Sequence, residues 1–315
     1  MSSETFAIDP ALPRGIPDGE GTIVTVGTFD GVHRGHWAVL QEIRERAATR
    51  GLRSVLVTFH PHPLKVVRPD SAPPLLTTPV EKKEILAESG LDYAVFLRFT
   101  VALSRYAPER FVDEVLIGRL GVRELVIGYD HGFGRGRSGD AETLRRIGEA
   151  RGFDVDVVPP VHAGETAISS TRIRSAIASG DLADARAGLG RDYGMRAVVV
   201  RGDGRGRTLG FPTANLGGLP SDKALPPAGV YAVRGSVRAG VFDGALHIGP
   251  RPTFPGAVPS IELHLIDFDG DLYGEEVRVD FVERVRDVQR FESVDDLIAQ
   301  LHRDVRRARA ILARD

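Results

Sequence analysis

The stretch Val24–His36, VTVGTFDGVHRGH, decides the fold of the first half of the chain. The apolar run over residues 23–26 predicts a buried strand, and Gly27 ends this strand before a polar turn. His33 and His36 then open a segment with apolar residues at helical spacing, namely Trp37, Leu40, Ile43 and Ala47. Histidines three positions apart share a helix face, here at the N-terminus, where backbone N–H groups and the helix dipole favour an anion. The pattern therefore predicts a phosphate site at a strand-to-helix turn.

The turn between this strand and helix carries three glycines, which allow a ligand to approach the backbone closely. It is neither a Gly-x-Gly-x-x-Gly loop nor a Gly-x-x-x-x-Gly-Lys-Ser/Thr loop. Its pattern resembles the signature of nucleotidyltransferases that transfer AMP or CMP, and the matching positions are Gly27, Phe29, Asp30, His33, Gly35 and His36. The resemblance implies that the turn binds ATP phosphates and that the two histidines are catalytic. A loop with two solvated histidines is the alternative.

Length and composition limit the class of protein. The chain has 315 residues, which predicts two domains of about 100–200 residues each. A net charge of −2 argues against a general nucleic-acid binder, and the absence of cysteine excludes disulfides and thiolate metal sites. No apolar run reaches the roughly 18 residues of a membrane span. Residues 1–21 also lack the apolar core of a signal peptide, so we expect a cytoplasmic protein that does not bind membranes.

Short apolar runs alternate with helical periodicity from Thr22 to Val158. We expect further strands at residues 54–59, 93–97, 125–127 and 155–158. Helices are expected at residues 79–89, where one face is charged, and at 108–117 and 141–150. This alternation predicts a doubly wound parallel α/β sheet that binds its ligands at the carboxyl ends of the strands.

Two polar loops follow predicted strands. In His60-Pro61-His62-Pro63 the prolines fix an extended turn, which favours a binding loop; a metal site would need third and fourth ligands that the sequence does not show. Residues 128–137 are rich in glycine and include two arginines, which suits a loop that wraps a nucleotide. A flexible surface loop is the alternative for this second stretch.

A second helix start follows at Ser169-Ser170-Thr171. Either serine can cap that helix, which is the purely structural interpretation. Hydroxyls, N–H groups and an arginine at one helix start also form a phosphate-binding end. Arg172 and Arg174 are two positions apart and cannot share a helix face. We therefore expect Arg172 to bind the ligand and Arg174 to point to solvent.

The second half of the chain has a different pattern, because the alternation stops over residues 184–192. Short apolar runs at residues 197–200, 230–233, 261–266 and 277–282, separated by glycine and proline turns, predict a small β-barrel. A last helix is expected from Ser293, with two aspartates in its first turn and an apolar stripe. The arginines near its end complement the helix dipole rather than form a nucleic-acid patch.

The barrel contains the second candidate site, in the stretch RGDGRGRTLGFPTAN at residues 201–215. Its glycines can expose N–H groups that cradle phosphates, and the residues concerned are Gly202, Gly206 and Arg207. Thr213 and Asn215 place neutral oxygens on one side of an extended segment, a donor set that suits Mg²⁺ together with phosphate oxygens.

Glu262 lies on a predicted strand, IELHL, whose apolar residues all face the other way. A lone glutamate on a strand is usually exposed to solvent. If its face instead meets the Mg²⁺ site, Glu262 is a candidate general base. General-base catalysis raises a reaction rate by about 10²–10⁴-fold.

Eight motifs occur in order along nearly the whole chain: GTFDGVHRGH, TFHPHP, SSTRIR, GRGRTLGFPTAN, GVYAV, RPTF, IELHL and DLYG. Together they resemble the bacterial bifunctional riboflavin kinase/FMN adenylyltransferases, or FAD synthetases. One departure is His247, where asparagine is expected, in a loop that flanks the kinase site.

This resemblance implies an N-terminal extension at residues 1–20, a Rossmann-like FMN adenylyltransferase domain at 21–188 and a six-stranded riboflavin kinase barrel at 189–315. It implies ATP, riboflavin, FMN and FAD as substrates or products, with Mg²⁺ as cofactor, in a monomer or weak homo-oligomer. Glu262 is the implied kinase base, and His33, His36 and Arg172 are implied to act in adenylyl transfer. The residues assigned to flavin binding are His62, Asp130, Phe133, Tyr231, Tyr273 and Arg286.

Two other functions are weighed against this one. An adenylyltransferase for another acceptor would share the first domain but would not explain Thr213, Asn215 and Glu262. A non-catalytic flavin or RNA binder could use the Gly-Arg loops without a general base, and an RNA binder would be expected to carry excess positive charge.

Overall fold

The computed structural model describes residues 21–129, 132, 139–202, 206, 209–249 and 260–314. These residues form two compact units. The first unit holds the described residues up to Pro73 together with Pro79–Ser170, and the second holds Pro74–Thr78 together with the chain from Thr171 onward. Three predicted site residues, Asp130, Phe133 and Arg207, lie outside the described residues.

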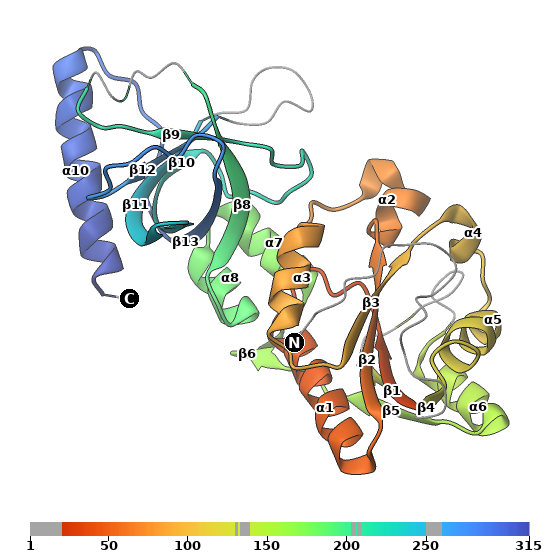
Figure 1. The fold of residues 1–315 in the computed structure, drawn as a ribbon. Helices are drawn as coiled ribbons and strands as arrows, with labels where there is room; N and C mark the ends of the chain where they lie inside the picture. The colour runs from red at the N-terminus through yellow and green to blue at the C-terminus, as the bar shows by residue number, and fades with distance from the viewer. Residues whose placement is uncertain are drawn as a thin grey trace. The chain divides into compact units, whose positions relative to one another are not determined.

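The first unit is built on a five-stranded parallel sheet in the order β3-β2-β1-β4-β5 (Figure 1). Its strands are β1 (Thr22–Val26), β2 (Arg53–His60), β3 (Tyr93–Arg98), β4 (Val122–Gly128) and β5 (Asp154–Val158). All four pairings are parallel, which confirms the predicted doubly wound sheet.

Helices cover both faces of this sheet (Figure 1). On one face pack α1 (Arg34–Arg50) and α3 (Pro79–Ala87), and on the other α5 (Pro108–Phe111), the π-helical η2 (Val112–Ile117) and α6 (Ala141–Arg151). Short elements complete the unit: α2 (Pro63–Val67), η1 (Pro69–Ser71), α4 (Val101–Ser104) and the hairpin of β6 (His162–Ala163) and β7 (Thr166–Ala167). The helix predicted at 108–117 is therefore two segments.

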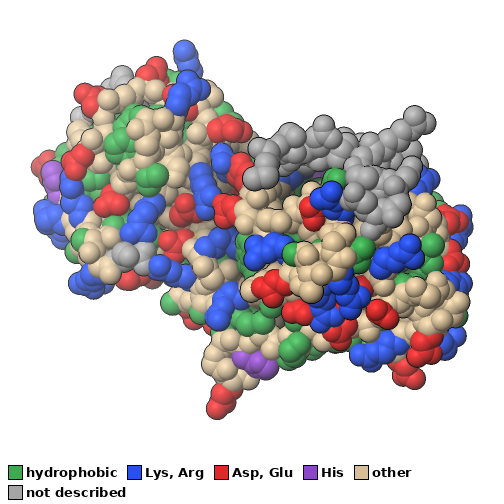
Figure 2. All heavy atoms as spheres, turned by 60° about the horizontal axis from the view of Figure 1, so that its bottom comes forward, with side chains coloured by type: hydrophobic (Ala, Val, Ile, Leu, Met, Phe, Trp, Pro, Cys, Tyr) green, Lys and Arg blue, Asp and Glu red, His purple; other side chains and the backbone are tan. Residues whose placement is uncertain are grey.

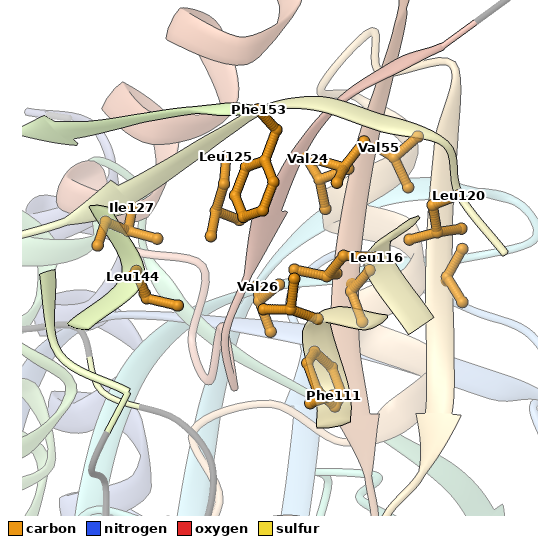
Figure 3. Close-up of a cluster of buried hydrophobic side chains, with 14 of the residues drawn as sticks. Val24, Val26, Val55, Phe111, Leu116, Leu120, Leu125, Ile127, Leu144 and Phe153 are labelled. Carbon is orange, nitrogen blue, oxygen red and sulfur yellow. The ribbon is translucent and has the colours of Figure 1, made fainter. Parts of the chain in front are cut away.

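Two hydrophobic cores follow from the period of two along β1. Ile23 faces the core under α1, whereas Val24 and Val26 face the core on the opposite side of the sheet. Figure 3 shows this second core, which also contains Leu125 and Phe153. Burying each such aliphatic side chain stabilises the fold by about 1.5–3 kcal/mol. Because β1 is buried along its whole length, its end and the turn after it are held firmly in place.

The second unit contains a closed barrel in the order β10-β11-β12-β9-β8-β13. Its strands are β8 (Tyr193–Val200), β9 (Ala214–Gly217), β10 (Gly229–Val237), β11 (Gly240–Ile248), β12 (Ile261–Leu265) and β13 (Glu276–Arg286). This confirms the predicted six-stranded barrel, although β9 and β11 are not among the strands expected from the apolar runs.

Three helices belong to the second unit: α7 (Ser170–Ser179) from Thr171 onward, α8 (Leu182–Leu189) and α10 (Val294–Leu312). Ser293 caps α10, as predicted, by accepting a hydrogen bond from the Asp296 N–H. The end of α10 buries Ala308, Ile311 and Leu312 against the barrel, which confirms the closing helix.

A short strap from the first half of the chain, Pro74–Thr78, is part of the second unit. Leu75 pairs with Lys223 in a parallel bridge, its N–H donates to Asp222 O at 2.7 Å, and its carbonyl accepts from the Ala224 N–H at 2.8 Å. The Lys223 side chain is 2% exposed and donates to Leu76 O at 2.8 Å. The strap thus pairs with the barrel through its backbone.

Candidate active sites

The turn between β1 and α1 has an unusual backbone. Phe29, Gly31 and Val32 have φ angles of 46°, 81° and 39°. The left-handed region is costly for a β-branched residue such as Val32, so the surrounding structure has to hold the turn. Part of that support comes from the start of α7, because Ser170 Oγ donates to Asp30 O at 2.9 Å.

The two histidines cap α1. The His36 N–H donates to His33 Nδ1 and the His33 N–H donates to His36 Nδ1, each at 3.3 Å, in a reciprocal capping box. The rings stack with their centroids 3.6 Å apart, and His36 also stacks on Phe29 at 4.5 Å. Since both Nδ1 atoms accept, each neutral ring carries its proton on Nε2, where it is a donor. The arrangement supplies two imidazole donors at one helix N-terminus.

Two glycines of this turn lie close to aromatic rings, so a larger residue at either position would crowd them. A Cβ on Gly27 would lie 2.9 Å from the Phe29 ring, and a Cβ on Gly35 would lie 3.2 Å from the His33 ring. Asp30 is 1% exposed, so the turn carries a buried carboxylate beside its strained backbone. Gly27, Phe29, Asp30 and Gly35 therefore lie on one continuous turn, and their binding of phosphate stays a prediction.

Helix α7 begins at Ser170, with Ser169 before it and Thr171 in its first turn. Arg172 is bonded to Asp184 on α8, with Nε 3.1 Å from Oδ2. Arg174 was expected to point to solvent, and its Nε donates to Pro74 O at 2.9 Å in a bond that is exposed to solvent. Arg172 serves the packing of α7 on α8 in this structure, and its role as a phosphate ligand stays a prediction.

His62 caps the short helix α2, because its Nδ1 accepts from the Leu64 N–H at 3.2 Å. Its predicted contact with flavin stays a prediction. No group of three or more His, Cys, Asp or Glu side chains that could hold a metal occurs among the described residues.

The sequence did not single out Lys82. It lies on α3, where we expected only a helix with a charged face, but Lys82 and Glu81 are buried. Lys82 Nζ donates to Thr28 O at 2.7 Å, directly at the turn after β1. In the sequence Lys82 stands between Glu81 and Lys83, so nothing there distinguishes it from a surface lysine.

In the second unit, three predicted residues come together across β9 and β12. Asn215 is the register partner of Glu262, and Thr213 Oγ1 donates to Glu262 Oε2 at 3.4 Å. Along β12 the residues Ile261, Leu263 and Leu265 are buried, while Glu262 is half-buried on the opposite face. The predicted alternation is confirmed, and it places a carboxylate beside a hydroxyl and an amide.

Two glycines pack against this group. A Cβ on Gly202 would lie 2.0 Å from Asn215 Nδ2, and a Cβ on Gly206 would lie 2.9 Å from Thr213 Oγ1. The backbone of the predicted phosphate nest therefore touches both residues predicted to bind Mg²⁺. A hydroxyl, an amide and a carboxylate form a hard oxygen set, which fits Mg²⁺ when substrate phosphates and water complete the octahedron.

His247 is next to Glu262 on the neighbouring strand, as its register partner between β11 and β12. Burial lowers the pKa of His247, and the Glu262 carboxylate opposes that shift. His264, two positions along β12, contacts Pro212 O through Nδ1 at 2.8 Å and packs edge-on against Phe211. These imidazoles flank the carboxylate on the same side of the sheet.

The residues predicted to bind flavin in this unit differ in their exposure. Tyr231 is fully buried and its hydroxyl donates to Pro227 O at 2.5 Å, which favours a structural role. Arg286 ties β13 to α10, with Nη2 donating to Asp304 Oδ2 at 2.7 Å. Tyr273 is 53% exposed, and the Arg201 guanidinium lies over its ring, 5.9 Å from the centroid.

The comparisons with known proteins cover both units. The family described as FAD synthetase matches residues 16–172, and the family described as riboflavin kinase matches residues 189–312. A crystal structure described as a macrolide-efflux protein from Streptococcus pneumoniae is 31% identical, covers 96% of this chain and 98% of that chain, and superposes with a TM-score of 0.86. Among the described residues, no helix is long and apolar enough to cross a membrane.

Curated relatives match over both halves at once. Bifunctional riboflavin kinase/FMN adenylyltransferases from Escherichia coli, Listeria monocytogenes and Bacillus subtilis are 40%, 37% and 34% identical to the chain. The matches span 92%, 93% and 91% of this chain and the same shares of the relatives. The chain therefore belongs to the family of bifunctional riboflavin kinase/FMN adenylyltransferases.

Proposed function

We propose that the second unit phosphorylates riboflavin to FMN with ATP and that the first unit adenylylates FMN to FAD with release of pyrophosphate. The observation that carries the proposal is the grouping of Asn215 and Glu262 on neighbouring barrel strands with Thr213, directly before β9. An adenylyltransferase acting alone, or a binding protein, has no use for this group. The histidine-capped turn of the first unit supplies the separate phosphate site that the second reaction needs.

In the kinase reaction, Glu262 takes the proton of the ribityl hydroxyl as its oxygen attacks the γ-phosphorus of ATP, and ADP leaves. Thr213 and Asn215 would hold Mg²⁺, which neutralises charge on the phosphates when bound. The backbone at Gly202 and Gly206 approaches these side chains closely and would cradle the phosphate oxygens.

In the adenylyl transfer, the FMN phosphate attacks the α-phosphorus of ATP, and the bond to the β-phosphate oxygen breaks. The attacking oxygen is already an anion, so no protein base is required. His33 and His36 would donate from Nε2 to phosphate oxygens, at a helix N-terminus that also favours negative charge. Positioning and charge neutralisation therefore carry this step.

The ligands are small molecules, ATP and flavins, and we propose no nucleic-acid partner. On the face drawn in Figure 2, lysine and arginine side chains are interspersed with aspartate and glutamate rather than gathered in one basic patch. We also propose a cytoplasmic protein, monomeric or weakly oligomeric, with Mg²⁺ as cofactor. For the domains we propose the boundaries 21–188 and 189–315. The riboflavin kinase match begins at 189, whereas the FAD synthetase match ends at 172 and the first compact unit ends at Ser170.

Chromatography of the products from riboflavin, ATP and Mg²⁺ tests this function. FMN should appear first and FAD should follow as FMN accumulates. A chain that yields FMN and no FAD, or that converts supplied FMN but never riboflavin, would contradict the assignment of two activities.

A further inference from the structure

Lys82 is a buried lysine beside the turn that follows β1. Its side chain is 8% exposed, and its ammonium donates to the Thr28 carbonyl at 2.7 Å. The same carbonyl accepts from Thr58 Oγ1 of β2 at 3.0 Å. Lysine is almost never fully buried without a reason, because removing an ammonium from water is costly. Two side chains from different elements therefore fix one peptide carbonyl.

Fixing this carbonyl also fixes the next N–H group. In a planar trans peptide the Thr28 carbonyl and the Phe29 N–H point in opposite directions. Lys82 and Thr58 draw the carbonyl toward the sheet and α3, so the Phe29 N–H is directed away from them. Three of the residues that follow, Phe29, Gly31 and Val32, have positive φ angles, which make the turn dependent on outside support.

The charged groups around Lys82 come from several elements. The buried Asp30 carboxylate of the turn attracts it, and the same carboxylate attracts Lys65 on α2. His60, at the end of β2, is disfavoured in its charged form by burial and then by Lys82, Lys65 and Lys83, so its pKa is lowered. Burial likewise lowers the pKa of Lys82 to about 8 against the pull of Asp30. Lys82 and Lys65 are thus both attracted to the buried carboxylate of Asp30.

We propose that Lys82 is a positioning residue for adenylyl transfer, whose ammonium orients the Thr28–Phe29 peptide toward the ATP phosphates and places a fixed positive charge behind the phosphate turn. The inference rests on the proposed assignment of adenylyl transfer to the first unit. Lys82 acts through the turn and does not itself contact the reacting atoms. It adds a fixed cation to the two imidazole donors at the start of α1.

Lys82→Met tests the proposal, because methionine fills similar space without the charge or the hydrogen bond. FAD formation from supplied FMN should lose about 10-fold or more in kcat/KM for ATP, in keeping with the loss of one preorganised electrostatic group. Riboflavin phosphorylation by the same chain should be unchanged, since it occurs in the other unit. Lys83→Met, at an exposed position on the same helix, is the matched control and should leave both rates near the parental values.

The pH profile of the parent chain gives a readout that needs no variant. Lys82 is charged below its pKa of about 8, so FAD formation should fall as the pH rises through that value. The free energy of unfolding should change in the opposite sense. The pKa of Lys82 is lower in the folded chain than in the unfolded chain, so the unfolded chain binds more protons at pH values between these two pKa values. Lys82 therefore favours folding more as the pH rises through this range. A purely structural lysine would leave the rate level over this pH range, as long as the chain stays folded.

The outcomes separate this inference from the proposed function. An adenylyl-transfer rate in Lys82→Met equal to the parental rate, or a parental rate that stays level or rises between about pH 7 and 9.5, overturns the role of Lys82 while leaving the two activities intact. A parent chain that makes no FAD at all contradicts the proposed function itself. If Lys82→Met does not fold, Thr58→Val serves in its place, because it removes the other hydrogen bond to the Thr28 carbonyl. A parental adenylyl-transfer rate in Thr58→Val would then overturn the role of the fixed carbonyl.

Discussion

Asn215 on β9 lies directly opposite Glu262 on β12, and Thr213 Oγ1 reaches the same carboxylate at 3.4 Å. In the sequence these residues are about fifty positions apart, and antiparallel pairing in the barrel brings them together. The pairing sets a carboxylate beside two neutral oxygen donors on the polar face of β12. A kinase needs this combination of a base and a place for Mg²⁺.

Glu262→Gln should abolish most kinase activity. Glutamine keeps the shape of the side chain and can still contact Thr213, but it cannot accept the proton of the ribityl hydroxyl, so phosphorylation should fall by about 10²-fold or more. Conversion of supplied FMN to FAD should be unaffected, and a steady-state assay of each step checks both. A parental kinase rate in this variant would show that Glu262 is an ordinary half-buried strand residue and not the general base.

Thr213 offers a test of the Mg²⁺ site. Thr213→Ala removes the hydroxyl oxygen, so the kinase should need a higher Mg²⁺ concentration for half-maximal rate, whereas Thr213→Ser keeps the oxygen and should stay close to the parent. Titration of the kinase rate with Mg²⁺ at fixed ATP measures the difference. Identical Mg²⁺ curves for the alanine and serine variants would exclude Thr213 as a ligand.

His33→Ala combined with His36→Ala should stop FAD formation and leave riboflavin phosphorylation intact. The capping box adds a complication, because loss of a helix N-cap costs about 0.5–2 kcal/mol in its own right. His33→Ser is therefore a useful companion, since serine preserves the cap but removes the imidazole. We expect this variant to remain as stable as the parent and still to lose adenylyl transfer. FAD made at the parental rate by the double variant would argue for solvated, non-catalytic histidines.

The strap Pro74–Thr78 bears on any fragment of the barrel. A fragment from Leu189 to Asp315 should fold, phosphorylate riboflavin and stop at FMN, because all the kinase candidates lie within it. It lacks Leu75 and Leu76, so Lys223 loses its bond to Leu76 O, while its bond to Gly194 O at 2.9 Å lies within the fragment. Lys223→Met should destabilise the full chain by about 1–3 kcal/mol, since buried carbonyls lose their donor.

The same substitution should cost the fragment less, because water reaches the ammonium once the strap is gone. Chemical denaturation of both proteins measures the two effects. Equal losses in fragment and full chain would show that the strap contributes nothing through Lys223. A folded fragment without kinase activity would show that the first half of the chain completes the kinase site.

Much of this architecture follows from local sequence. The buried run at β1, the glycine turn and the periodic apolar residues of α1 predict a strand-turn-helix unit, because each signal is strong over a short span. Ser293 predicts the start of α10 by the chemistry of an N-cap. Strands β9 and β11 were not predicted, because neither contains a clear apolar run. β9 has only four residues, and in β11 the apolar residues are interrupted by glycine, aspartate and histidine.

The site was predictable in its residue types more than in its contacts. Thr213, Asn215 and Glu262 were recognised as oxygen donors and a base, but only the barrel register shows that they meet. The sequence predicts Arg172 as a phosphate ligand because it lies in the first turn of a helix. Its bond to Asp184 could not be predicted, because that bond depends on how α8 packs against α7. Lys82 gave no signal, because burial of a single lysine is decided by tertiary packing.

A complementation assay tests the central claim, that two independent sites on one chain make FAD in sequence. Glu262→Gln alone, and the His33→Ala/His36→Ala variant alone, should each fail to make FAD from riboflavin, ATP and Mg²⁺. Mixed together, they should make it, because FMN released by the histidine variant becomes the substrate of the glutamate variant. FMN that accumulates in the mixture without conversion to FAD, or no FMN at all, would contradict the account.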